Sequence, residues 1–213
     1  FFNMPEGIII IFQIVVLVYS VVIHEVSHGI VAHALGDNTA KNAGRLTLNP
    51  FKHLDPFGSF FLPLILFIST GFTVGYAKPV PYDPRNLSDH RHGPAKVALA
   101  GPASNIILAL LFGVVYRILV GTMISPVMLE LIQVIILINI SLAIFNLVPI
   151  PPLDGHWLLF SVLPARFLAF RTFLYRYSLP LLFIFIIFIF PRIFFIIMYL
   201  FRLVSGVPGL SIY

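Results

Sequence analysis

The sequence from Gly7 to Gly36, GIIIIFQIVVLVYSVVIHEVSHGIVAHALG, decides the class of fold. No charged residue occurs from Ile8 to Ile23, and the apolar pattern then continues through a short polar group to Gly36. As a helix these 30 residues would measure about 45 Å, which exceeds the ~30 Å hydrocarbon core of a bilayer. His24 lies near the middle of this stretch. The sequence therefore predicts a membrane-spanning helix with ionisable groups inside the bilayer zone.

The composition of the whole chain agrees with a membrane protein. Of its 213 residues 59% are hydrophobic and only 10% are charged, whereas soluble domains have roughly 45–50% and 25%. This excludes a soluble domain, a disordered chain and a coiled coil. The chain has no cysteine, which excludes disulfides, a thiolate zinc site and a cysteine nucleophile. The net charge of +5 relates to membrane topology, because basic residues accumulate on the cytoplasmic side, and does not indicate nucleic-acid binding.

Four further apolar blocks follow the first helix. They are 57–74, interrupted by Pro63 and Gly71, then 95–120, 126–148 and 179–203, the last broken at Pro191. The fold class expected is an all-α polytopic membrane protein with about five to six membrane segments. We expect one domain over residues 1–213, with a catalytic core at about 7–163 and a C-terminal membrane segment at about 177–205.

Two short alternating stretches, 44–50 and 75–81, predict strands of a small membrane-associated β-sheet on either side of block 57–74. The loops 37–56, 76–96 and 164–176 hold three, four and three Lys or Arg residues. If block 57–74 is re-entrant, all three basic loops share one side, and the positive-inside rule favours that arrangement. A spanning helix remains the alternative, because proline and glycine also occur in spanning helices.

The group His24-Glu25-Val26-Ser27-His28 carries the main chemical signal. Residues i and i+4 share a helix face, so both imidazoles can reach one metal ion, while Glu25 can act as general base on a metal-bound water. Composition predicts roughly 0.003 chance occurrences of H-E-x-x-H in this chain. The alternative is a polar helix face that lines a pore or packs internally without metal. Ionisable groups at this depth are costly unless they are paired or bind metal.

A catalytic zinc takes three protein ligands and a water, so a third ligand must come from elsewhere. Among the eight acidic residues only Asp154 lies at the end of a long apolar helix, just after the prolines 149, 151 and 152. These prolines prevent a regular helix, and a broken segment at membrane depth is tolerated where it lines a cavity. Asp154 is therefore the candidate third ligand. It could also, or instead, cap the helix that begins at His156.

The remaining histidines have weaker signals. His33 lies five residues after His28, about 140° around the helix, and should miss the metal. His53, His90 and His92 lie in polar loops, where surface positions are the usual outcome. His156 lies two residues after Asp154 and is a candidate neighbour of the ligands.

At this point the sequence resembles the site-2 protease family of intramembrane zinc metalloproteases. The segment 146–155, NLVPIPPLDG, matches the family pattern N-x-x-P-x-P-x-L-D-G, and 101–105, GPASN, is similar to its G-x-x-x-N element. With H-E-x-x-H these run in the family's order and cover about residues 22–156. The chain shows no PDZ-like or CBS-like domain and so resembles a minimal form.

The resemblance implies a role for each matching residue. His24, His28 and Asp154 would hold one Zn²⁺ per chain, and Glu25 would be the general base. Asn105 and Asn146 would lie near the scissile carbonyl or support the ligands. The edge of the β-sheet would bind the substrate in extended form.

The expected function is that of an intramembrane zinc endopeptidase acting within or near transmembrane segments. The expected partners are transmembrane protein or peptide substrates and the lipid bilayer, with no nucleic acid; the sequence sets no oligomeric state. The expected location is a multi-pass position in a prokaryotic cytoplasmic membrane. Two alternatives are a catalytically silent scaffold of the same fold, which would not need Glu25 together with a metal, and a transporter. A transporter predicts paired charges or repeated broken helices, which this sequence lacks.

Overall fold

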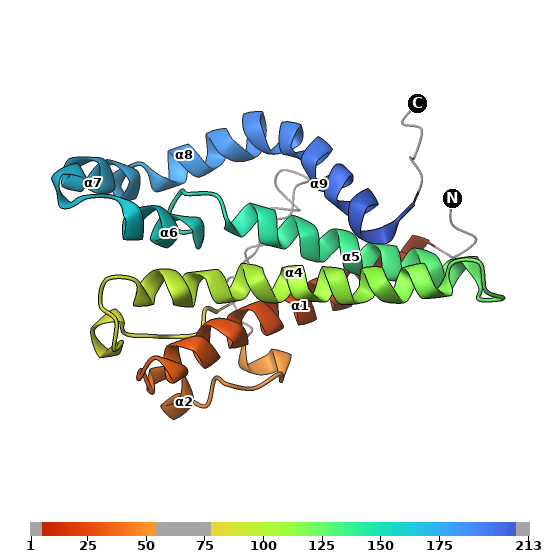
Figure 1. The fold of residues 1–213 in the computed structure, drawn as a ribbon, viewed down its shortest axis with the longest axis horizontal. Helices are drawn as coiled ribbons and strands as arrows, with labels where there is room; N and C mark the ends of the chain where they lie inside the picture. Colours follow the sequence, from red (N-terminus) through yellow and green to blue (C-terminus); the bar gives the residue numbers. More distant parts are fainter. Residues whose placement is uncertain (1–5, 54–77, 208–213) are drawn as a thin grey trace.

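The computed structural model describes residues 6–53 and 78–207, and helices dominate both ranges (Figure 1). The α-helices are α1 (Glu6–Ala34), α2 (Thr39–Asn42), α4 (Gly93–Leu119), α5 (Pro126–Asn146), α6 (Gly155–Val162), α7 (Leu168–Arg176), α8 (Ser178–Ile184) and α9 (Phe190–Ser205). Short 3₁₀ turns cover Pro50–Lys52, Pro84–Asn86 and Ala165–Phe167, and a π-helical turn covers Phe185–Ile189. The described ranges hold no β-strand.

Four helical stretches are long and apolar enough to cross a membrane. They are Gly7–Ala34, Gly93–Leu119, Pro126–Asn146 and Ser178–Ser205. The expectation of a mostly helical, multi-pass membrane protein is confirmed. The expected count of five to six segments is not supported: the described residues hold four, and block 57–74 lies outside them.

The long helices run alternately in opposite directions. α1 and α5 point towards the end of the bundle where α2, α6 and α7 lie, and α4 and α8–α9 point away from it (Figure 1). α2, the segment that precedes α4, and α7, which belong to the three basic loops, lie at that end (Figure 1). α4 is the central helix, because it contacts α1, α5, α6 and α9.

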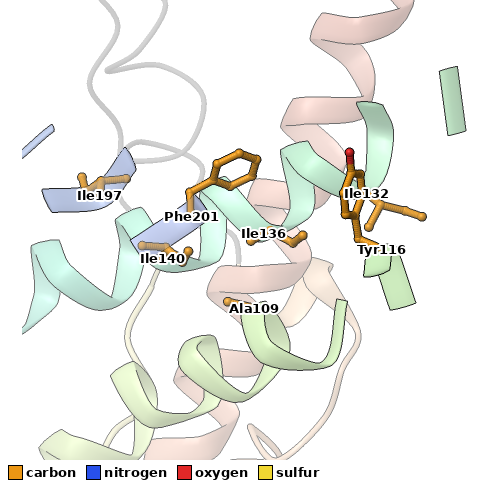
Figure 2. Close-up of a cluster of buried hydrophobic side chains, with 7 residues drawn as sticks. All are labelled: Ala109, Tyr116, Ile132, Ile136, Ile140, Ile197 and Phe201. Atoms are coloured by element: carbon orange, nitrogen blue, oxygen red, sulfur yellow. The ribbon is translucent and has the colours of Figure 1, made fainter. Parts of the chain in front are cut away.

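An apolar cluster holds α4, α5 and α9 together at the opposite half of the bundle (Figure 2). Its buried side chains are Ala109, Tyr116, Ile132, Ile136, Ile140, Ile197 and Phe201. Lipid tails are as apolar as these side chains, so the hydrophobic effect does not drive the helices together inside a membrane. Close packing between the helices supplies the stabilisation here.

The last spanning stretch changes its winding where the sequence predicts a break. The π-helical turn Phe185–Ile189 separates α8 from α9, and Pro191 lies in the first turn of α9. Proline has no backbone N–H to donate to the preceding turn, and a wider turn accommodates this loss. The side chain of Arg192 donates to the carbonyl oxygen of Phe188 at the same place.

The predicted strand over 44–50 is wrong. Gly44 has a φ of +62°, which ends the turn after α2, and Asn49 accepts from the backbone N–H of Phe51 and starts a 3₁₀ turn. Side chains replace the strand ladder: Arg45 Nη2 donates to the carbonyl oxygens of Lys78 and Pro79. Residues 78–81 of the second predicted strand form no strand either, and its residues 75–77 lie outside the described ranges.

A buried carboxylate links the end of α1 to the segment that precedes α4. Asp37 is fully buried, and its oxygens accept from the backbone N–H and hydroxyl of Thr39, from Asn86 Nδ2 and from the backbone N–H of Asp83. Burial alone would raise the pKa of Asp37, but these hydrogen bonds outweigh it and lower the pKa below its usual value. The carboxylate is therefore ionised at neutral pH and fixes residues 83–86 against α1.

Candidate metal centre

Two histidines of α1 and one aspartate from the chain after α5 converge inside the bundle. The ring centroids of His24 and His28 lie 4.6 Å apart at 88°. Asp154 Oδ2 lies 3.0 Å from His24 Nε2 and 3.3 Å from His28 Nε2, and the three ligand atoms all fall within 4.8 Å of one another. Both histidines are buried, and α1 continues about 15 Å beyond His24 to its end at Ala34.

Asp154 reaches the histidines from an irregular segment between α5 and α6. It occupies the N-cap position of α6, but its side chain makes no capping hydrogen bond, so its carboxylate is turned towards the two imidazoles instead. A side chain at Gly155 would collide with the backbone carbonyl groups of Leu147 and Val148. The turn that presents Asp154 therefore requires glycine at the next position.

Hydrogen bonds on the far side of each imidazole set its orientation. His24 Nδ1 lies 2.6 Å from Asn105 Oδ1, and His28 Nδ1 lies 2.6 Å from the carbonyl oxygen of Val97. Both acceptors are oxygens, so each Nδ1 carries the hydrogen and each Nε2 presents a lone pair towards Asp154. This tautomer is inferred from the hydrogen-bond network.

A further pair of buried polar residues fixes the amide of Asn105. Asn139 donates through Nδ2 to Ser20 Oγ at 3.0 Å and to the carbonyl oxygen of Ile135 at 2.9 Å, so its Oδ1 faces Asn105 and accepts from Asn105 Nδ2 at 2.9 Å. The oxygen of Asn105 must then face His24. Asn105 and Asn139 are fully buried. The sequence alone did not single out Asn139 and Ser20, although each is a polar residue in a mostly apolar helix.

The donor set fits a catalytic zinc ion. The two Nε2 atoms and a carboxylate oxygen of Asp154 face one point, and in the tautomer set by Asn105 and Val97 neither Nε2 carries a hydrogen, so a cation would satisfy all three. Ligand atoms held ~2.0–2.1 Å from a tetrahedral zinc lie roughly 3.3 Å apart, which agrees with the separations from Asp154 of 3.0 and 3.3 Å. Three protein ligands also leave the fourth position open for water.

Gly101 on α4 makes room for this arrangement. A Cβ built at Gly101 would lie 2.5 Å from Cε1 and Nε2 of His24 and 2.5 Å from Nε2 of His28. Gly101 and Asn105 are separated by one helical turn, so glycine admits the two rings while asparagine orients one of them. Gly101 belongs to the motif 101–105, but the sequence alone indicates no role for it.

The ligands open into a cavity of about 230 Å³. Its lining also includes Glu25, Tyr82, Asn146 and Trp157. Glu25 is half-buried, and its Oε2 accepts from the backbone N–H of Val80 at 2.8 Å. Asn146 is the last residue of α5 and donates through Nδ2 to the carbonyl oxygen of Leu142 at 3.0 Å, so it borders the cavity without contacting a ligand atom.

His156 is buried beside the site but faces away from it. Its Nδ1 lies 2.6 Å from the carbonyl oxygen of Leu153 and its Nε2 lies 3.3 Å from the hydroxyl of Tyr175. Burial lowers the pKa of His156, which keeps the ring neutral and lets Nε2 accept from Tyr175. It is absent from the residues that line the cavity.

The other histidines are placed as expected with one exception. His33 is not part of the three-residue group, and His90 and His92 are exposed. His53 was expected at the surface but is 1% exposed, and its Nε2 donates to the carbonyl oxygen of Thr47 at 2.8 Å. A hydrogen-bonded histidine can be buried in a polar loop, and the local sequence does not distinguish this case.

The fold and site together define a helical membrane protein with a His-His-Asp group that could bind a metal ion, beside a glutamate. The profile of Peptidase family M50 matches residues 12–128 and 118–189, which together cover most of the chain. The chain belongs to peptidase family M50. This confirms the resemblance to the site-2 proteases and makes the protein a metalloprotease by family.

Two curated relatives have names that agree with this family. "Putative zinc metalloprotease YwhC" of Bacillus subtilis (strain 168) is 38% identical over 159 residues, which cover 72% of this chain and 69% of that protein. "Putative zinc metalloprotease Rip2" of Mycolicibacterium smegmatis is 31% identical over 137 residues, 64% of this chain and 51% of that protein. The chain thus spans about two thirds and about half of the lengths of these relatives. No solved structure gives a significant match.

Proposed function

We propose that this protein is an intramembrane zinc endopeptidase that hydrolyses peptide bonds within or near transmembrane segments of membrane proteins. One observation carries the proposal: two imidazoles and a carboxylate converge within 4.8 Å, beside Glu25, in a bundle of helices that can span a membrane. Membership of a peptidase family and the names of its relatives support it independently.

We assign the metal to His24, His28 and Asp154. Bound zinc supplies Lewis-acid polarisation of the scissile carbonyl and lowers the pKa of its water ligand. The hydrogen bonds from His24 to Asn105 and from His28 to Val97 hold the rings in the tautomer that binds metal. We propose a positioning role for Asn105 through His24, and for His156 through the backbone of Leu153.

Glu25 is assigned as the general base. One of its oxygens is held by the backbone N–H of Val80, which leaves Oε1 to take a proton from the attacking water. As the water oxygen bonds to the carbonyl carbon, the π pair moves to the carbonyl oxygen. When that pair returns, the C–N bond breaks, and the nitrogen takes the proton from Glu25. Asn146, at the rim of the cavity, is proposed to contact the substrate backbone.

The substrate class follows from where the cavity lies. It opens among helices α1, α4 and the α5–α6 segment inside the bundle, so we propose transmembrane proteins or peptides as substrates. We assign the end of the bundle with the basic loops to the cytoplasm of a prokaryotic cell, and water to an entry from that end. The ligands and base all fall within the proposed core 7–163, with residues 177–205 as the additional membrane segment of the single domain.

The test is cleavage of a transmembrane reporter in proteoliposomes by wild type and Glu25→Gln. The substitution keeps the size of the side chain and removes the base, so we expect cleavage to fall by roughly 10²- to 10⁴-fold while zinc remains bound at one ion per chain. The matched control is Glu130→Gln, the same change near the start of α5, which should leave cleavage unchanged.

Each alternative function predicts a different result. A silent scaffold would bind zinc but show no cleavage in wild type. A transporter would show no cleavage and no zinc. Near-normal turnover by Glu25→Gln, with Glu130→Gln as the reference, would overturn the role of Glu25.

A further inference from the structure

An extended segment, residues 78–82, forms one wall of the catalytic cavity and is held at several points. Arg45 Nη2 donates to the carbonyl oxygen of Lys78 at 2.8 Å and of Pro79 at 3.3 Å. The backbone N–H of Val80 donates to Glu25. Directly after the segment, the backbone N–H of Asp83 donates to Asp37 Oδ2 at 2.8 Å. The position of this wall relative to Glu25 is therefore fixed from both sides.

Tyr82 is the last residue of this segment and turns inward. Val80 is buried, Pro81 is exposed and Tyr82 is half-buried, which is the alternation of extended backbone. The side chain packs against the buried cluster of Ala32, Leu87 and Val97. Tyr82 also lines the same cavity as Glu25 and the three proposed ligands.

The hydroxyl of Tyr82 is buried but has no hydrogen-bond partner among the described residues. A buried polar group without a partner destabilises the folded state, and phenylalanine would make the same packing contacts without this penalty. The hydroxyl therefore does not serve the stability of the fold. Because Tyr82 lines the cavity, a molecule that fills the cavity can supply the partner.

The hydroxyl is suited to donate and not to accept a proton. Burial, together with the negative charge of Asp154, raises the pKa of Tyr82 to about 12. Tyr82 thus keeps its hydrogen at neutral pH. A neutral donor in a low-dielectric cavity can stabilise negative charge that develops on a substrate atom.

We propose that Tyr82 is a further catalytic residue whose hydroxyl donates a hydrogen bond to the oxygen of the scissile carbonyl as that oxygen becomes negatively charged. The proposal rests on the proposed endopeptidase function. In the addition step the π pair of the carbonyl moves onto this oxygen, and the hydrogen stays on Tyr82 throughout. The proton that leaves the water goes to Glu25, so the two residues have separate tasks.

The test is Tyr82→Phe in the full-length protein with the same transmembrane reporter. Loss of one donor to a developing oxyanion typically lowers kcat by about 10²- to 10³-fold. For Tyr82→Phe we expect kcat to fall by about 10- to 10³-fold, with KM within twofold of wild type. Zinc content should remain one per chain. Because the substitution removes an unpartnered group, the midpoint of thermal unfolding should stay equal or rise.

The matched control is Tyr116→Phe, which removes the same atom in the apolar cluster. Its hydroxyl has a partner, Gln133 Nε2 at 2.7 Å, so this variant should lose stability and keep its activity. Tyr82→Phe should therefore lose activity but not stability, and Tyr116→Phe should lose stability but not activity.

A second measurement does not depend on turnover. Mass spectrometry identifies the bond that is cleaved in the reporter. A peptide with a phosphinic group in place of that bond mimics the tetrahedral, negatively charged form of the scissile carbonyl. Tyr82→Phe should weaken its binding by the same factor as kcat/KM, and should leave the binding of a non-cleavable reduced-amide peptide unchanged.

Turnover within twofold of wild type, or equal loss of affinity for both peptides, would overturn the role of Tyr82. Neither result would change the proposed endopeptidase function, which is tested by cleavage of the reporter by wild type.

Discussion

The two halves of α4 pack against different partners, although each brings a glycine to its closest contact. In the first half, Gly101 faces the rings of His24 and His28. In the second half, Gly113 faces Val204 of α9, beside the apolar cluster. Small residues allow close helix contacts in membranes in both cases. The first half, however, fixes the orientation of the polar groups around the candidate metal site, and the second half packs mainly apolar side chains.

The difference lies in how many arrangements each half permits. The chain of hydrogen bonds from Ser20 through Asn139 and Asn105 to His24 is complete in one orientation of each amide. Apolar side chains such as Ile136 can shift by fractions of an ångström at a small cost. We therefore expect substitutions in the first half to change metal binding and substitutions in the second half to change stability.

The largest effect is expected for Gly101→Ala. The added Cβ would lie within 2.5 Å of both imidazoles, whose rings can yield only by leaving Asn105 and Val97. We expect zinc affinity to fall by at least about 10²-fold and cleavage to fall with it. The unfolding midpoint without zinc should also fall, because the two buried hydrogen bonds that the rings lose are worth more than the about 1 kcal/mol by which alanine favours helix over glycine. Zinc titration and thermal unfolding measure the two quantities.

Gly7→Ala is the matched control for Gly101→Ala. It makes the same change in a helix where a Cβ meets nothing within 4 Å, and zinc affinity should stay at the wild-type value. Full zinc affinity in Gly101→Ala would show that the rings adjust without loss, and the contrast between the halves of α4 would disappear.

A smaller effect is expected for Asn139→Leu. Leucine fills a similar volume but no longer holds the amide of Asn105, so His24 loses its fixed tautomer. Loss of such an outer partner typically weakens metal binding by about 10- to 100-fold. The zinc dissociation constant, measured by competition with a chelator, should rise by this factor.

Gln133→Leu is the control for Asn139→Leu, since it removes an amide from the apolar half of the same helix. It should lower stability through the lost bond to Tyr116 and leave zinc affinity unchanged. The effect of Asn139→Leu should also disappear when Asn105 is already replaced by leucine, because both act through one hydrogen-bond chain. Additive effects would contradict a shared route to His24.

The sequence predicts the ligands of this site better than their supports. His24 and His28 follow from helical periodicity, and Asp154 follows from its place at a proline-broken helix end. Gly101 and Asn139 act across helices, and a single sequence carries no signal for which faces of two helices meet. Tyr82 lies in a segment whose inward face is set by Arg45 and Asp37, and both are distant in sequence.

The same limit explains the errors in the fold. The stretch 44–50 alternates like a strand, but the guanidinium of Arg45 occupies the carbonyl oxygens with which a strand would pair. His53 is buried for the same kind of reason, because its partner is the backbone of Thr47. In both cases side-chain hydrogen bonds to the backbone decide the structure, and the local pattern does not reveal them.

The smallest effect is expected for Gly113→Ala, in the apolar half of α4. The new Cβ would collide with the side chain of Val204 and lie 2.9 Å from its carbonyl oxygen, so the end of α9 must move outward. Overpacking costs about 1–3 kcal/mol, and the helix preference of alanine offsets up to about 1 kcal/mol of this. With the full offset a net loss of about 0–2 kcal/mol remains, which corresponds to a fall in Tm of up to about 8 °C. The displaced carbonyl groups of Leu203 and Val204 also accept from Arg117, and the loss of these bonds would place the fall at the upper end of that range.

Thermal unfolding in detergent measures the shift, and zinc affinity and kcat, measured on the same preparation, should match wild type. A tenfold loss of zinc affinity in Gly113→Ala would mean that the two halves of α4 are coupled, and the apolar cluster would then be part of the support of the metal centre.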